Sequence, residues 1–116
     1  MSVSFQGMDQ LVVTFQAAAG VSKGDFVKVS ANGTVSAASS GEAPAGRVLN
    51  VRGGHAAVQL RGYTEAVYTG TLGLGWQDVT AAGSGKLKAA GENDEVRKCL
   101  VVSTDTTAKL ACLLLW

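Results

Sequence analysis

Histidine, cysteine and proline are scarce in this chain of 116 residues, which contains one histidine, two cysteines and one proline. A structural zinc site needs four cysteine or histidine ligands at close spacing, and the chain has only three such residues. A serine-type catalytic triad would have to use His55, which follows two glycines and is expected to lie exposed in a hairpin turn. We therefore expect no metal site, no cofactor and no enzymatic activity.

Charged side chains are scarce as well, because they make up 16% of the chain, and the formal net charge is +1. Soluble domains carry about 25% charged residues, so we expect that another protein covers part of this surface. Nucleic acids and anionic membranes attract basic patches, which a balanced charge does not provide. We therefore expect neither a nucleic acid nor a membrane as a partner.

Long apolar runs and an early basic segment are also missing. No apolar run approaches the roughly 20 residues of a membrane-spanning helix. No lysine or arginine precedes Lys23, whereas a secretory signal begins with a basic segment. These two absences predict synthesis in the cytoplasm.

Two glycine motifs are similar to nucleotide-binding loops but lack the residues that define them. The segment 83–86 (GSGK) is followed by Leu87, where a phosphate-binding loop needs a serine or threonine for magnesium. The segment 73–75 (GLG) lacks the third glycine of a dinucleotide-binding loop. We interpret both segments as turns between strands.

The 15 glycines and the many valines predict an all-β fold, a small barrel or sandwich of short antiparallel strands. Short apolar runs are separated by glycine or Asn-Gly at intervals of about 8–12 residues, which is typical of such folds. Residues 1–10 show no clear periodicity and are expected to form an extended N-terminal arm, while residues 11–116 form one barrel domain. The expected strands are 11–16, 25–30, 34–38, 46–52, 55–61, 62–69, 76–80, 86–89, 96–103 and 107–115.

The barrel domain is expected to contain two lobes that repeat one another. In each half a glycine, an aromatic residue and a valine lead into a glycine turn, a short strand, a polar loop and a long apolar hairpin. The offset between the halves is about 51–52 residues, which is large enough for one supersecondary unit. The predicted repeats span about 20–69 and 70–116.

The first long hairpin is expected to turn at Gly53 and Gly54, the type of dipeptide that two-residue turns favour. Strict alternation along its strands then separates an apolar face from a polar one. The predicted core side chains are Leu49, Val51, Ala56, Val58 and Leu60.

The last hairpin is expected to turn at Asp105 and Thr106, which sets Cys99 directly opposite Cys112. The same register sets Val101 opposite Leu110 and Arg97 opposite Leu114, on the face expected to form the core. Both cysteines are expected to remain reduced thiols, as in other cytosolic proteins. This pairing directs a row of large apolar side chains outward, as in an interaction patch; the alternative is that the chain itself covers both faces of this hairpin. The expected interface with a capsid protein or a second copy contains Phe5, Met8, Leu100, Val102, Leu113, Leu115 and Trp116.

Three segments carry a resemblance to a known family: 19–35 (AGVSKGDFVKVSANGTV), 46–50 (GRVLN) and 57–62 (AVQLRG). In their glycines, turns and strand starts they resemble the small β-barrel capsid decoration (cement) proteins of tailed bacteriophages, over roughly residues 11–115. The resemblance implies a structural protein of the virion, made in the host cytoplasm and bound to the capsid exterior. It further implies a homo-oligomer, with a trimer preferred, that bridges neighbouring major capsid proteins. It brings no catalytic residues.

Two other functions remain as alternatives at this point. The chain could be another β-module of the virion, such as a component of the tail or of a head fibre. It could also be a small barrel that binds single-stranded nucleic acid, which would require aromatic stacking platforms in a basic groove. Seven aromatic residues and a net charge of +1 make the last alternative the weaker one.

Overall fold

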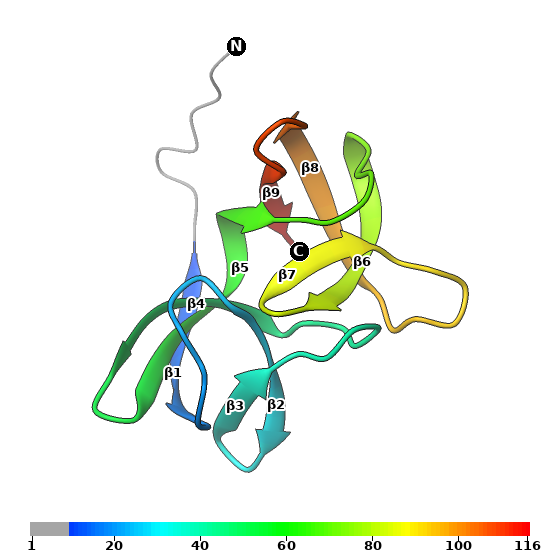
Figure 1. The fold of residues 1–116 in the computed structure, drawn as a ribbon. Coiled ribbons are helices and arrows are strands. Elements are labelled where there is room, and N and C mark those ends of the chain that lie inside the picture. The colour runs from blue at the N-terminus through cyan, green and yellow to red at the C-terminus, as the bar shows by residue number, and fades with distance from the viewer. Residues whose placement is uncertain (1–9) are drawn as a thin grey trace.

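The computed structural model describes residues 10–116 and confirms the all-β prediction (Figure 1). Phe5, Met8 and the rest of residues 1–9 lie outside the described residues. The two segments predicted as separate strands around Arg61 and Gly62 form one long strand, β5. The strands are β1 Leu11–Ala17, β2 Phe26–Ala31, β3 Thr34–Ala37, β4 Gly46–Arg52, β5 His55–Val67, β6 Gly75–Gly83, β7 Lys86–Ala89, β8 Arg97–Asp105 and β9 Leu110–Leu115.

The nine strands form one continuous sheet in the order β1-β3-β2-β4-β5-β9-β8-β6-β7. A further pairing between β1 and β5 closes the first five strands into a ring. The second half of β5 continues the order as β5-β9-β8-β6-β7. A parallel bridge between Tyr68 and Leu87 closes this second group of strands. The long strand β5 therefore belongs to both halves of the molecule, and Figure 1 shows β1–β3 at one end and β6–β9 at the other.

The two halves repeat the same hydrogen-bonding pattern. In the first half Ala17 pairs in parallel with Val35, and the Ala18 N–H donates to the Val35 carbonyl at 2.9 Å. In the second half Tyr68 pairs in parallel with Leu87, and the Thr69 N–H donates to the Leu87 carbonyl at 2.9 Å. These equivalent residues are 51 or 52 positions apart.

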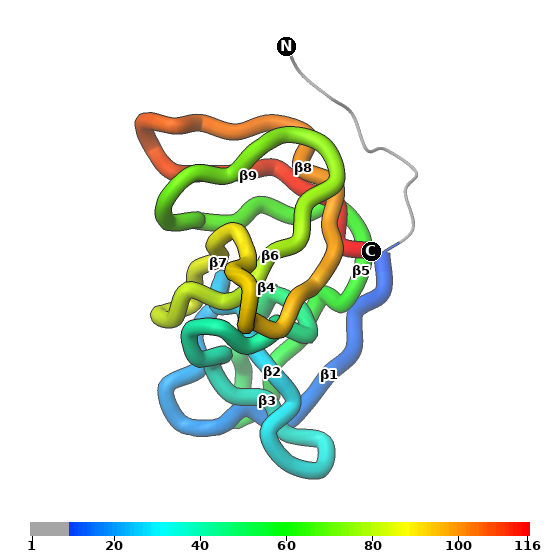
Figure 2. Tube along the Cα trace, turned by 90° about the vertical axis from the view of Figure 1, so that its right-hand side faces the viewer, coloured from blue at the N-terminus to red at the C-terminus, as the bar shows by residue number. Residues whose placement is uncertain are grey.

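The boundary between the repeated units lies inside β5. Strand β1 begins opposite Arg61, and β9 ends opposite Gly62, so both strands run antiparallel to β5 and lie end to end along it. Figure 2 shows the end of β9 next to the beginning of β1. By this pairing, the first unit runs from β1 to Arg61 and the second begins at Gly62.

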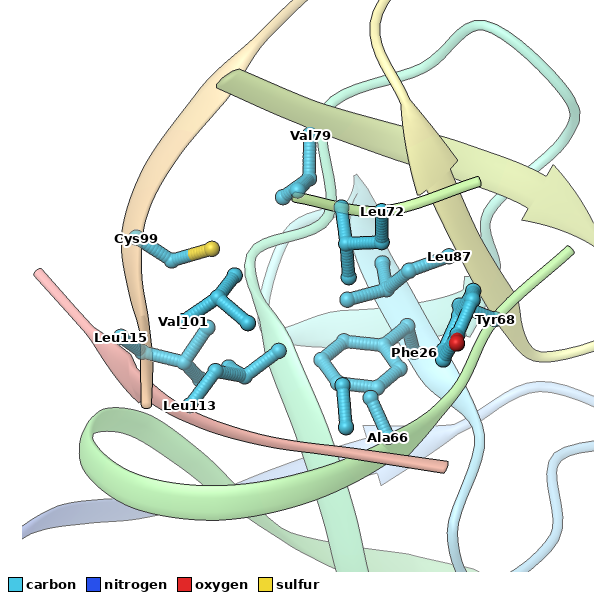
Figure 3. Close-up of a cluster of buried hydrophobic side chains, with 11 residues drawn as sticks. Phe26, Ala66, Tyr68, Leu72, Val79, Leu87, Cys99, Val101, Leu113 and Leu115 are labelled. Carbon is cyan, nitrogen blue, oxygen red and sulfur yellow. The ribbon is translucent and has the colours of Figure 1, made fainter. Parts of the chain in front are cut away.

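The apolar core is divided between the two halves. A cluster of small residues fills the first ring, and it consists of Val27, Val35, Val48, Ala56 and Val58. A larger cluster with leucine and aromatic side chains fills the second half (Figure 3), and it consists of Phe26, Ala66, Tyr68, Leu72, Val79, Leu87, Cys99, Val101, Ala111, Leu113 and Leu115. Phe26 lies on β2 and so carries the larger cluster across into the first half.

One half-buried arginine joins the two halves. Arg97 begins β8 and donates hydrogen bonds to the backbone carbonyls of Pro44, Ala45 and Leu60, all in the first half. Desolvation lowers the pKa of this arginine. Because charged donors make stronger hydrogen bonds than neutral ones, Arg97 fixes the start of β8 against the loop before β4.

The first long hairpin has the predicted turn, but a β-bulge changes the register beyond it. Arg52 faces His55 across Gly53 and Gly54 as expected, and Val51 faces Ala56. The bulge at Leu49 then sets Val48 opposite Val58, so Val48 is buried and Leu49 is only half-buried. The prediction that Leu49 occupies the core is therefore wrong, because an extra residue on one strand reverses the side that its neighbours face.

The predicted register of the last hairpin is also wrong. The turn occupies four residues, 106–109, because the Asp105 carboxylate accepts hydrogen bonds from the N–H groups of Thr107 and Ala108 at 3.0 and 3.1 Å. This longer turn moves the register by four residues, and a β-bulge between Val101 and Ser103 reduces the shift to three, so Val101 pairs with Leu113 instead of Leu110. A shift by three residues turns every side chain of β9 to the opposite face. Leu113 and Leu115, expected to point outward, therefore lie in the core.

The same shift separates the two cysteines. Cys99 pairs with Leu115, and Cys112 pairs with Ser103, so they are not cross-strand neighbours as predicted. Cys99 is buried in the larger cluster, and burial raises the pKa of its thiol to about 11. Cys112 is half-buried on the other face of the sheet, and both thiols are free, as expected for a reduced protein.

Candidate functional site

An apolar row crosses the outward side of the second half of the sheet. Trp76 pairs with Leu100, Leu100 with Leu114, and Leu114 with Tyr63, so these four residues lie side by side on β6, β8, β9 and β5. Their neighbours along β8 and β9 are buried in the core, and side chains alternate between the two faces of a strand. We call this row, together with Trp116, the outer face.

Two tryptophans form the most exposed part of the outer face. The Trp76 side chain is 55% exposed and that of Trp116 is 64% exposed. Their ring centroids lie 6.2 Å apart with an angle of 76° between the planes, an edge-to-face contact. The Arg61 guanidinium lies 5.0 Å from the centroid of the Trp116 ring, within the range of a cation–π interaction. The tryptophans are thus held in place by ring contacts while much of their surface stays accessible.

A hollow of about 480 Å³ adjoins these rings. It lies where β9 ends and β1 begins along β5, and its walls include Leu11, Arg61, Leu114 and Trp116. Leu11 is itself about half exposed. The hollow therefore offers an apolar wall and a single cation next to the tryptophan pair.

The other side of the outer face is fixed by polar contacts. Hydrogen bonding with the Cys112 side chain, together with burial, raises the pKa of Tyr63 to about 12, so the phenol stays protonated at neutral pH. Lys98 and Asp78 form an exposed ion pair at 3.8 Å beside the row. Exposed pairs of this kind contribute little to stability, so the apolar row dominates the chemistry of this face.

The predicted interface residues have different positions in the structure. Leu100 and Trp116 lie on the outer face, and Val102 is half-buried at the β-bulge between Val101 and Ser103. Leu113 and Leu115 are core residues, and Phe5 and Met8 fall outside the described part of the chain. Sequence reasoning missed the other members of the outer face and hollow, namely Arg61, Tyr63, Trp76 and Leu114. The correct register of β9 would have identified Leu114, which the predicted register placed in the core.

Tryptophan, tyrosine and arginine are the residues that most often carry the binding energy of protein interfaces. The outer face combines tryptophan and tyrosine with two leucines on a sheet, and Arg61 lies beside it. Residues 10–116 contain no group of three histidine, cysteine, aspartate or glutamate side chains that could hold a metal ion. In the same part of the chain, no helix has the length and apolar character needed to cross a membrane.

Comparison with known protein families gives no matching family model, and no curated protein matches the chain.

Proposed function

We propose that the protein is a structural binding protein that attaches to the outer surface of a tailed-phage capsid and stabilises it by bridging capsomers. Attachment uses the outer face, and the protein performs no catalysis. The oligomer in this proposal is a trimer, a number that comes from the family resemblance of the sequence.

The observation that carries this proposal is the exposed pair of Trp76 and Trp116 beside Arg61. A tryptophan side chain offers a large apolar area at a low cost in conformational entropy, and exposed apolar patches of this kind mark interaction sites on soluble proteins. The low share of charged residues, 16%, supports the same conclusion because it leaves a surface that favours association.

The choice of a capsid as the partner depends on the sequence segments 19–35, 46–50 and 57–62, which resemble capsid decoration proteins. Packaged DNA strains a capsid from inside. Subunits that each contact two capsomers raise the free energy needed to separate them. Modest contacts are sufficient, because contacts within one oligomer reinforce one another through their high effective concentration.

The protein composition of purified phage particles tests this proposal. Mass spectrometry should find the chain in copy numbers comparable to those of the major capsid protein. A few copies per particle would favour a tail or head-fibre component instead, and absence from particles would refute the proposal. Light scattering of the free protein should give three times the chain mass of 11.8 kDa, and a monomer mass would refute the trimer.

Substitutions on the outer face test which surface makes the contact. The double variant Trp76→Ser, Trp116→Ser should lower particle occupancy about tenfold or more, since buried interface tryptophans are typical hot spots. Val29→Ser is the matched control, because Val29 is 53% exposed but lies on β2 in the other half. Equal occupancy for the parent protein, the double variant and Val29→Ser would show that the outer face is not the attachment surface.

Single-stranded nucleic acid is the second candidate partner, and the Arg61–Trp116 contact is the observation that favours it. Bases stack on exposed aromatic rings, and arginine adds a cation–π contribution. An oligonucleotide titration followed by tryptophan fluorescence tests this candidate. Saturable quenching that disappears in Trp116→Ser would support it over the capsid.

A further inference from the structure

A second hollow, of about 340 Å³, is lined by residues from both halves of the molecule, and none of them belongs to the outer face. Its walls come from the loop before β2, from β4, from the second half of β5 and from the β6–β7 turn. Three cationic side chains line it, namely Lys23, Arg47 and Lys86. They come from three segments that are distant in sequence, so only the fold brings them together.

Arg47 has a guanidinium that is only partly satisfied. One of its terminal nitrogens, Nη1, donates a hydrogen bond to the Thr64 hydroxyl at 3.2 Å. Its Nε is buried and has no hydrogen-bond partner among the described residues. Leaving a buried donor without an acceptor is unfavourable. The edge of the guanidinium formed by Nε and Nη2 therefore lacks an acceptor.

Two carboxylates also line this hollow, but neither forms an ion pair with Arg47. The Asp25 carboxylate accepts a hydrogen bond from the Ser22 N–H at 2.9 Å and packs against Gly85. Glu65 is exposed on β5. The three cations and two anions give the hollow a net charge of +1, which favours an anionic ligand.

Glycines keep the backbone close to the guanidinium. Gly24 has φ +92°, and a side chain built there would begin 3.7 Å from Arg47 Nη2. Gly85 has φ +77°, and a side chain there would overlap the Asp25 carboxylate. Both positions are in the left-handed region, where glycine is favoured. The absence of a side chain at Gly24 leaves space beside Arg47, whereas the space at Gly85 is filled by the Asp25 carboxylate.

We infer that this hollow binds a single oxyanion group, a carboxylate or a phosphate, on the free Nη2 group of Arg47. The neighbouring Nε is closed off by surrounding atoms, so the contact is a charge-assisted hydrogen bond from Nη2. Lys23 and Lys86 add attraction as point charges. The group comes either from an acidic side chain of a partner protein or from free phosphate. This site is separate from the outer face and does not depend on the proposed function.

Titration of the free protein with sodium phosphate or sodium acetate, at constant ionic strength maintained with sodium chloride, tests the inference. The signal is the NMR resonance of the Arg47 Nε–H group together with the backbone amides of Ser84 and Lys86. We expect a saturable shift with a dissociation constant on the order of 1 mM. A response to acetate identifies a carboxylate ligand, and a response to phosphate alone identifies free phosphate.

Arg47→Gln should weaken the binding more than tenfold, as expected for loss of charge-assisted hydrogen bonds. Arg52→Gln is the matched control, because Arg52 is an exposed arginine at the end of the same strand. Lys86→Gln should weaken binding several-fold. Because Lys86 is exposed, this variant should fold normally, so it tests the inference even if Arg47→Gln does not fold. No saturable shift with either anion, or equal binding by all variants, would overturn the inference.

Discussion

Three consecutive leucines on β9 provide the sharpest test of the structure. Leu113 and Leu115 are buried in the larger core cluster, whereas Leu114 lies half-buried on the outer face between Leu100 and Tyr63. The register predicted from the sequence reverses this arrangement. Alanine substitution at two adjacent leucines therefore decides between the two registers.

The magnitudes follow from the burial of each side chain. Leu113 is 0% exposed, so Leu113→Ala removes a fully buried isobutyl group and leaves a cavity, at a cost of about 2–5 kcal/mol in the free energy of unfolding. Leu114 is only partly shielded from water, so Leu114→Ala should cost roughly 1 kcal/mol, about half of the transfer free energy of a buried leucine. Because single domains are stable by only about 5–15 kcal/mol, the first substitution removes a large share of the total.

Urea denaturation followed by circular dichroism measures both variants against the parent protein. The midpoint should fall much further for Leu113→Ala than for Leu114→Ala, with little change in the denaturant slope. An equal or larger loss for Leu114→Ala would refute the assignment of β9 and with it the outer face. Leu114→Ala should also lower binding to the partner protein, whereas a pure core change acts through stability alone.

Three further predictions follow from single contacts. The Lys28 ammonium holds the pKa of Glu42 below its ordinary value of 4.5. The stability that this carboxylate adds is therefore present above pH 4.5 and is lost as the pH falls through the lowered pKa. Glu42→Gln should flatten the acid side of the stability–pH curve, and an unchanged curve would contradict the ion pair. Burial raises the pKa of Cys99 to about 11, so a maleimide at neutral pH should label Cys112 first, and equal labelling by mass spectrometry would contradict the burial of Cys99. A methyl group on Gly46 would overlap a backbone carbonyl of β5, so Gly46→Ala should cost about 1–3 kcal/mol in urea denaturation, and parent-like stability would show that β4 and β5 pack less closely.

The strands could be predicted from the sequence because glycines, including the one Asn-Gly pair, separate them. The predicted segments 46–52 and 86–89 agree with β4 and β7 residue for residue. The sequence offset between the two halves could also be predicted, since Val35 and Leu87 occupy equivalent positions. These features depend on local residue types, which a sequence displays directly.

The register of the hairpins could not be predicted in the same way. It depends on whether the Asp105 side chain caps a longer turn and on where a bulge inserts one residue. Both are decided by hydrogen bonds that residue types permit but do not require. Because the error reversed the faces of β9, the candidate site gained Leu114 and lost Leu113 and Leu115.

The repeated architecture separates what the fold requires from what a binding surface requires. Both halves use the same strand order and the same parallel closure, at Ala17 and at Tyr68. The first half exposes a mixture of residues, with Thr14 and Asn50 as well as Val12 and Val29 open to solvent, and it contains no tryptophan. A sheet of this order therefore forms without a row of tryptophans and leucines, and the apolar row around Trp76 is not needed to form the strands. Large exposed apolar groups that the fold does not need are best explained by contact with a partner, which is why substitutions on the outer face should affect binding and leave the sheet intact.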